Sequence, residues 1–163
     1  MIYDGNDLSP WLRCNPQRPI LPPVENSAQE VPGRDGSRLV RSKLGALTIP
    51  VKVRLRARRG EDVAELRHML AAMLRREEPA PLVLPDDPTR YHMAVLDGSS
   101  DLDRLWYTGS AELTFVAHDP IAYGQLHEAA MGSSATLHVA GTHPSAPVIT
   151  ARPGRSSRYR ITL

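Results

Sequence analysis

The most regular stretch of the chain alternates between apolar and charged residues. In "LTIPVKVRLRAR", residues 47–58, every second side chain is apolar. The positions between them include four cations, Lys52, Arg54, Arg56 and Arg58. Side chains of a β-strand point alternately to its two faces, so the pattern predicts a strand with one buried and one solvated face. Pro50 indicates that this strand lies at a sheet edge or starts there.

The following stretch changes to a helical period. In "GEDVAELRHMLAAMLRRE", apolar residues recur at steps of three and four, which predicts one long amphipathic helix over 61–77. Asp62 is the expected N-cap, and Glu65 follows three positions later, as in a capping box. Arg75 and Arg76 fall in the last turn, where cations suit the helix dipole.

Strand patterns also lie on both sides of the helix. "MIYDGNDLSPWL" at the start of the chain predicts a short hairpin with an Asp-Gly turn. "APLVL", "RYHMAVLDG" and "GSAELTFVAH" follow the helix and read as further strands. Four or five strands with one inserted helix indicate an α+β layer arrangement for about the first 120 residues.

Between these elements lies a segment with few core-forming side chains. Residues 15–23 hold four prolines and should be extended, and "EVPGRDGSRL" at 30–39 places two turn-forming pairs almost back to back. An isolated hairpin is only marginally stable in water. An ordered arm here would therefore lie against something else, commonly another subunit. The alternative is a mobile loop, and composition does not choose between the two.

The chain changes character after residue 124. "QLHEAAMGSS" has the composition of a linker, and three short strand-like segments follow it up to the last residue. Three strands from about thirty residues make a marginal unit. We therefore expect residues 125–163 to hold a truncated second domain, or strands that complete a sheet elsewhere.

Candidate catalytic chemistry is sparse. The 163 residues carry a net charge of +2 and one cysteine, Cys14, and the six histidines form no metal-binding motif. No nucleophile motif, P-loop or dinucleotide fingerprint is present, so the sequence gives no positive reason to expect an enzyme or a cofactor. With a single cysteine, no signal peptide pattern and no membrane-length apolar run, we expect a soluble intracellular product.

The cation row of residues 52–58 is the best electrostatic feature. A solvated sheet face or an interface with acidic partners is favoured, because neighbouring strands can supply acidic side chains. A nucleic-acid-binding module is an alternative, although few aromatic residues are available for base stacking. A carbohydrate-binding module using Trp11 or Trp106 is a third reading, and the chain after residue 125 offers only Tyr159 as a further aromatic platform.

The order of these landmarks resembles the distal tail proteins of long-tailed, non-contractile bacteriophages. The resemblance rests on the "PGRDG" arm, the basic alternating strand, the "DDPTRY" stretch and the "FVAHDPIAYG" ending, in this order and spacing. It covers residues 1–124, and 125–163 more weakly. Within it, only the opening strands of the family's C-terminal domain are recognisable, so no sugar binding is expected.

The resemblance implies a structural hub without catalysis or cofactor. It implies an N-terminal antiparallel β-sandwich over 1–124, with helix 61–77 and an extended hairpin arm, the belt, at 24–40. It also implies a homo-hexameric ring at the end of the tail tube, which meets the tail-tip proteins, with the protein assembled in the host cytoplasm and located in the virion tail. Neither membrane contact nor a nucleic-acid partner is implied. By motif, the belt residues in contact with the neighbouring subunit are Val31, Pro32, Gly33, Arg34, Asp35 and Gly36.

Overall fold

The computed structural model describes residues 1–56, 63–98 and 109–128, together with residues 130, 136, 141–144 and 148–150. The chain divides into two compact units, Met1–His127 and Glu128–Leu163. The strands predicted after residue 135 lie mostly outside the described residues, so the fold of a partial C-terminal domain stays a prediction.

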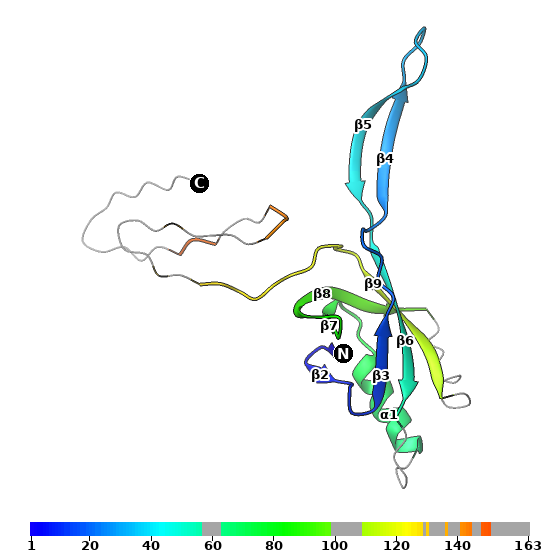
Figure 1. Ribbon diagram of the computed structural model, residues 1–163, viewed down its shortest axis with the longest axis vertical. Coiled ribbons are helices and arrows are strands. Elements are labelled where there is room, and N and C mark those ends of the chain that lie inside the picture. Colours follow the sequence, from blue (N-terminus) through cyan, green and yellow to red (C-terminus); the bar gives the residue numbers. More distant parts are fainter. Residues whose placement is uncertain are drawn as a thin grey trace, which may run out of the picture. The chain divides into compact units, whose positions relative to one another are not determined.

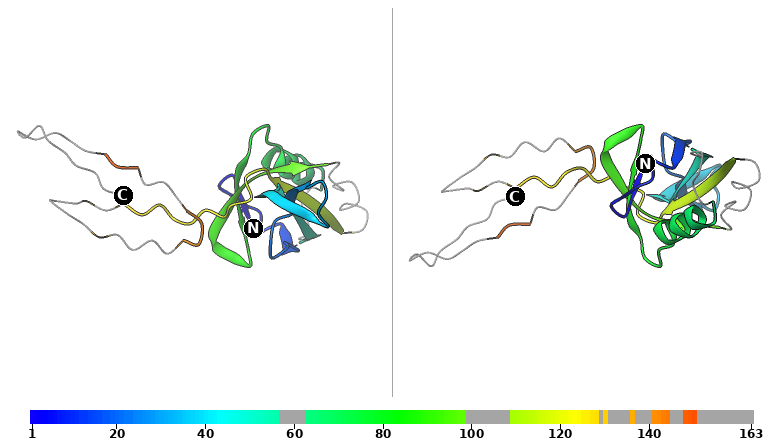
Figure 2. Two further views of the ribbon diagram at one scale, coloured as in Figure 1. Left: turned by 90° about the horizontal axis from the view of Figure 1, so that it is seen from above. Right: turned by 90° about the horizontal axis from the view of Figure 1, so that it is seen from below.

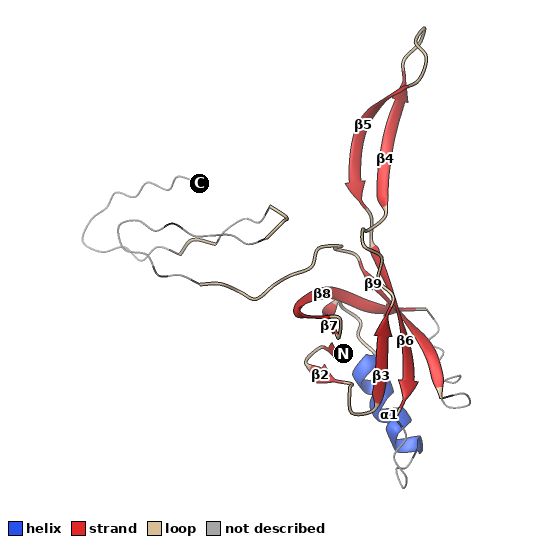
Figure 3. Ribbon diagram, viewed as in Figure 1, coloured by secondary structure: helices blue, strands red, loops and turns tan. Residues whose placement is uncertain are grey.

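The described residues of the first unit are mostly antiparallel β-structure with one helix (Figures 1 and 3). Seven of its described strands form one sheet in the order β2-β1-β7-β8-β9-β6-β3, and β4 and β5 form a separate two-stranded sheet. The strands are β1 Ile2–Tyr3, β2 Asn6–Asp7, β3 Leu12–Pro16, β4 Val24–Glu30, β5 Ser37–Leu44, β6 Leu47–Leu55, β7 Ala80–Leu84, β8 Asp87–Asp97 and β9 Ser110–Ala117. Every recorded strand pairing among them is antiparallel.

The large sheet folds over a single apolar core. Tyr3 on β1 and Phe115 on β9 are fully buried, and their rings meet edge to face with centroids 5.2 Å apart. In the sheet, β7 and β8 lie between β1 and β9. The two rings can meet only because the sheet curves, so that β1 and β9 face each other across the core. The Tyr3 hydroxyl donates to the Ala94 carbonyl at 3.2 Å, which satisfies its polar end inside the core. The arrangement is sandwich-like.

Strand β6 follows the predicted alternation. Leu47, Ile49, Val51 and Val53 are buried, whereas Lys52 and Arg54 are exposed. The interpretation of Pro50 as an edge or start residue is wrong, because β6 lies between β9 and β3. Proline is tolerated there because the ladder with β3 ends at the pair Pro16–Val51. The Pro50 carbonyl accepts from Gln17 on that same side, so the missing N–H falls just beyond the end of β3.

The helix is shorter than predicted. α1 spans Val63–Leu74, 12 residues, and the expectation of one long helix reaching residue 77 is wrong. The predicted N-cap, Asp62, lies outside the described residues. Leu66, Leu70 and Leu74 are buried in the core cluster, and α1 lies on one side of the sheet (Figure 2).

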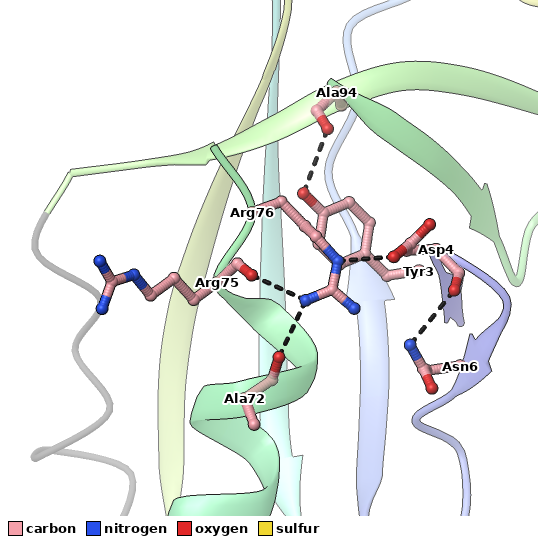
Figure 4. Close-up of polar contacts among 7 residues, drawn as sticks. All are labelled: Tyr3, Asp4, Asn6, Ala72, Arg75, Arg76 and Ala94. Atoms are coloured by element: carbon pink, nitrogen blue, oxygen red, sulfur yellow. Dashed lines mark hydrogen bonds and ion pairs between the residues drawn. The ribbon is translucent and has the colours of Figure 1, made fainter. Parts of the chain in front are cut away.

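Arg76 explains how the helix ends. Its Nη1 donates to the carbonyls of Ala72 at 2.9 Å and Arg75 at 2.7 Å, which have no partners within the helix. Its Nε lies 2.6 Å from a carboxylate oxygen of Asp4, in the turn between β1 and β2 (Figure 4). Asp4 has φ 49° and precedes Gly5, so the predicted Asp-Gly turn is present. The guanidinium thus caps α1 and ties it to the first hairpin.

Candidate functional site: an exposed hairpin and a basic sheet face

Strands β4 and β5 form a hairpin without a core of its own. All residues of Val24–Glu30 and Ser37–Leu44 are exposed, and in Figure 1 the two strands lead away from the sheet. Leu39 and Val40 are 59% and 63% exposed. At the base, the Gly45 N–H donates to the Pro23 carbonyl at 2.7 Å, which closes the hairpin where it leaves the domain. The β-structure extends to Leu44, beyond the predicted end at residue 40.

The predicted belt residues, 31–36, form the tip of this hairpin. All six are exposed. Gly33 and Gly36 have φ of 79° and 87°, a region that favours glycine, and the Arg34 N–H donates to the Val31 carbonyl at 3.2 Å. These contacts are local to the turn. The contact of residues 31–36 with a neighbouring subunit therefore remains a prediction.

The hairpin has two chemically different faces. Cross-strand partners project to the same face of an antiparallel pair, and consecutive residues alternate. The neutral face consists of the pairs Val24–Leu44, Asn26–Ser42, Ala28–Leu39 and Glu30–Ser37. The charged face consists of the pairs Glu25–Lys43, Ser27–Arg41 and Gln29–Arg38. A register shift between Ser27 and Ala28 keeps both sets in phase along the hairpin.

Charge is divided unequally between these faces. The neutral face has one charged residue, Glu30, next to the tip. On the charged face, Lys43 Nζ lies 2.6 Å from a Glu25 carboxylate oxygen, and both side chains are more than half exposed. An exposed pair of this kind adds little stability. The neutral face, not the charged one, carries the solvent-exposed apolar side chains Val24, Leu39 and Leu44.

The predicted cation row lies on the outer face of the large sheet. Lys52, Arg54 and Arg56 are exposed, whereas Arg58 lies outside the described residues. The register adds Arg13 of β3, directly opposite Arg54, and places Glu112 of β9 opposite Lys52. A shallow hollow of about 730 Å³ includes these residues in its lining. Within the described part of the chain, no ion pair is recorded for Arg13, Lys52 or Arg54. We call Arg13, Lys52 and Arg54 the basic patch.

One histidine of the first unit lies inside the protein. His92 on β8 is 5% exposed, and neither ring nitrogen has a hydrogen-bond partner among the described residues. Burial, and then the Arg18 guanidinium, lower the pKa of His92, while the Asp87 and Asp86 carboxylates act in the opposite direction. Arg18 itself lies 3.0 Å from Asp86 and 3.7 Å from Asp87. His92 is therefore neutral in the folded protein at neutral pH.

This neutral histidine predicts that stability falls on mild acidification. The unfolded chain takes up a proton near the usual histidine pKa of about 6.5, whereas the folded chain does so only at lower pH. The free energy of unfolding should fall as the pH drops below about 6.5, down to the lowered folded-state pKa. Urea denaturation at pH 7, 6 and 5 measures this. His92→Leu should flatten the dependence, and His68→Gln on the exposed side of α1 should not. An unchanged slope in His92→Leu would contradict the assignment.

The remaining candidate groups do not form a reactive centre. Cys14 is half-buried, and burial raises the pKa of its thiol, so it is not a thiolate at neutral pH. No group of three or more His, Cys, Asp or Glu residues with metal-binding geometry occurs in the described ranges. In those ranges, no helix is long and apolar enough to cross a membrane. Trp106 lies outside the described residues.

Comparison with known proteins identifies the class. The family model of the phage tail protein RIFT-related domain matches residues 6–117, more than half of the chain, and the chain belongs to this family. It is a phage tail component with a structural role in the virion tail. A comparison with curated protein sequences finds no match.

Among solved structures, the chain is similar to the Dit protein of phage SPP1. That crystal structure is described as a paradigm of the hub adsorption apparatus in phages that infect Gram-positive bacteria. The TM-score is 0.62 with 21% sequence identity, over 76% of this chain and 51% of the Dit chain. The chain thus spans about half the length of that protein. The resemblance to distal tail proteins is confirmed at the level of family and fold.

Proposed function

We propose that this protein is the subunit of a hexameric hub ring at the distal end of a siphophage tail. The ring joins the tail tube to the baseplate and receptor-binding apparatus, and it assembles in the host cytoplasm. Membership of the phage tail family and the fold shared with Dit of SPP1 support this function. Its role is structural, and it requires neither a cofactor nor a catalytic group.

The exposed hairpin β4–β5 is the observation that carries the proposal. It is ordered as a two-stranded sheet, yet every one of its strand residues is exposed. Two strands alone are marginal in water, and leaving Leu39 and Val40 solvated has a free-energy cost. A neighbouring subunit removes that cost, and a closed ring gives every hairpin a subunit to contact. In this arrangement the hairpin is the belt, and its tip, residues 31–36, contacts the neighbouring subunit.

Light scattering across a concentration series tests the ring. The full chain has a mass of 18.0 kDa, and we expect a species of about six chains to grow in as the protein concentration rises. Assembly through the hairpin should show no large change in far-UV circular dichroism, because the hairpin is already formed in the single chain. A mass that stays at one chain up to millimolar concentration would contradict the proposal.

A further inference from the structure

We infer that the neutral face of the hairpin lies on the outer face of β6 and β9 of a second copy, with Glu30 against the basic patch. This inference rests on the proposed function, since it names the surfaces through which one subunit holds the next. Residues of both surfaces are exposed or half-buried in the single chain. The partner is a second copy of this chain.

The first support is the polarity of the hairpin. A two-stranded sheet that contacts a partner through one face buries that face, and burial favours the less charged one. The neutral face offers the side chains of Leu39 and Leu44, with a single charge at Glu30. The charged face offers Arg38, Arg41 and the Glu25–Lys43 pair, which remain solvated if that side is turned outward.

The second support is an unmatched charge on each surface. Glu30 has no ion pair recorded in the described part of the chain. On the outer face of the sheet, Arg13 and Arg54 are directly opposite each other. Like charges in opposite positions destabilise a sheet, and an incoming carboxylate reverses that effect. Lys52, next to them on the same face, has only Glu112 as an acidic cross-strand neighbour.

The third support is that charged and uncharged residues follow one another in the same order along the two surfaces. Pro50 lies two residues before Lys52 on β6, and Thr114 of β9 is opposite Pro50. Both residues are half-buried. Ala28 lies two residues before Glu30 on β4, and Leu39 of β5 is opposite Ala28. Two residues of strand span about 6.6 Å on either surface. Placing Glu30 over Lys52 therefore brings the Ala28–Leu39 pair over Pro50 and Thr114.

Continuing the same alignment preserves the match. A further two residues along each surface brings Asn26 and Ser42 of the hairpin over Thr48 and Val116 of the sheet. No charged side chain of either strand pair lies in this part of the contact. The charged contact is confined to the tip end of the hairpin, and the neutral contact to the part nearer its base. Electrostatic matching of this kind fixes the register of two surfaces.

Charge reversal in the full chain tests the inference, with the concentration of half-assembly as the measured quantity. Glu30→Lys and Lys52→Glu should each raise that concentration about tenfold. Because every subunit then carries both changes, the double variant should return to within about threefold of the unmodified protein. Gln29→Lys is the matched control, since it adds a lysine one position away on the charged face, and it should change the concentration less than about threefold.

A second pair of variants tests the apolar part of the contact. Leu39→Ser should raise the half-assembly concentration about tenfold, whereas Arg38→Ser on the opposite face should leave it within about threefold. Equal effects from the two faces, or no recovery in the Glu30→Lys, Lys52→Glu double variant, would overturn the inference. If those results were obtained but removal of the hairpin still abolished assembly, the proposed function would stand and only the assignment of the two contact surfaces would fail.

Two further outcomes would also contradict the inferred contact between the hairpin and the sheet. If a protein lacking the hairpin assembled as well as the full chain, the proposed function would fail together with this inference. If the assembled ring bound a single-stranded DNA oligonucleotide and Lys52→Glu abolished the binding, the basic patch would be a nucleic-acid surface left uncovered by the hairpin. Absence of DNA binding by the assembled ring supports a patch that is covered by protein.

Discussion

Removing the hairpin should abolish assembly while leaving the domain folded. In this variant an Asn-Gly turn replaces residues 24–44 and joins Pro23 to Gly45. The Pro23 carbonyl and Gly45 N–H already form a hydrogen bond of 2.7 Å, which is the bond that closes a two-residue hairpin turn. Because the deleted strands are exposed throughout, the core loses no buried side chain. The concentration of half-assembly should rise at least about a hundredfold, equivalent to about 3 kcal/mol.

The control for this deletion is the stability of the single chain. The urea midpoint of the shortened protein should match that of the dissociated full chain, since both retain the same core. Light scattering reports the assembly, and far-UV circular dichroism reports the fold. A shortened protein that still forms the same oligomer would show that the contacts between subunits lie elsewhere. One that no longer folds would show that the hairpin belongs to the domain.

Phe115→Ala should be the most destabilising single substitution in the core. Phe115 is fully buried and packs edge to face on Tyr3, a contact that joins β9 to β1 across the core. Truncation of a buried phenylalanine removes its buried apolar area and leaves a cavity, at a cost of about 3–5 kcal/mol in the free energy of unfolding. Single domains have about 5–15 kcal/mol in total, so the variant should be close to unfolding. Urea denaturation measures the change.

Val116→Ala is the matched control for that substitution. It removes two methyl groups from the next residue of β9, but on the half-buried outer face of the sheet. We expect it to cost less than about 1.5 kcal/mol. Equal losses from the two variants would contradict the assignment of buried and outer faces on β9. The same assignment supports the position of Thr114 and Val116 in the subunit contact.

The hydrophobic pattern of the sequence predicted strand β6 and the buried side of helix α1. The alternation of residues 47–55 predicted β6 and its two faces, because period-two burial is a property of the strand itself. The three- and four-residue period predicted the buried side of α1. The end of the helix was missed because Arg76 binds Asp4, 72 residues earlier, instead of supporting another turn. The position of Pro50 was misread because strand order is not visible in the pattern around it.

The functional surfaces were predicted only in part for the same reason. Lys52 and Arg54 stand out in one strand, but Arg13 joins them only through the pairing of β3 with β6. The turns at 32–36 predicted the hairpin tip. The division of the hairpin into a neutral and a charged face depends on the register shift at Ser27–Ala28, which local propensity does not indicate. His92 appeared as one of six scattered histidines, and only the fold shows its burial.

Electron cryo-microscopy of the assembled protein would show whether each hairpin is bound by a neighbouring subunit. We expect a closed ring of six chains, in which residues 24–44 of every chain lie across the domain of the adjacent chain. A particle in which those residues pack on their own domain, or contact no neighbouring chain, would contradict it.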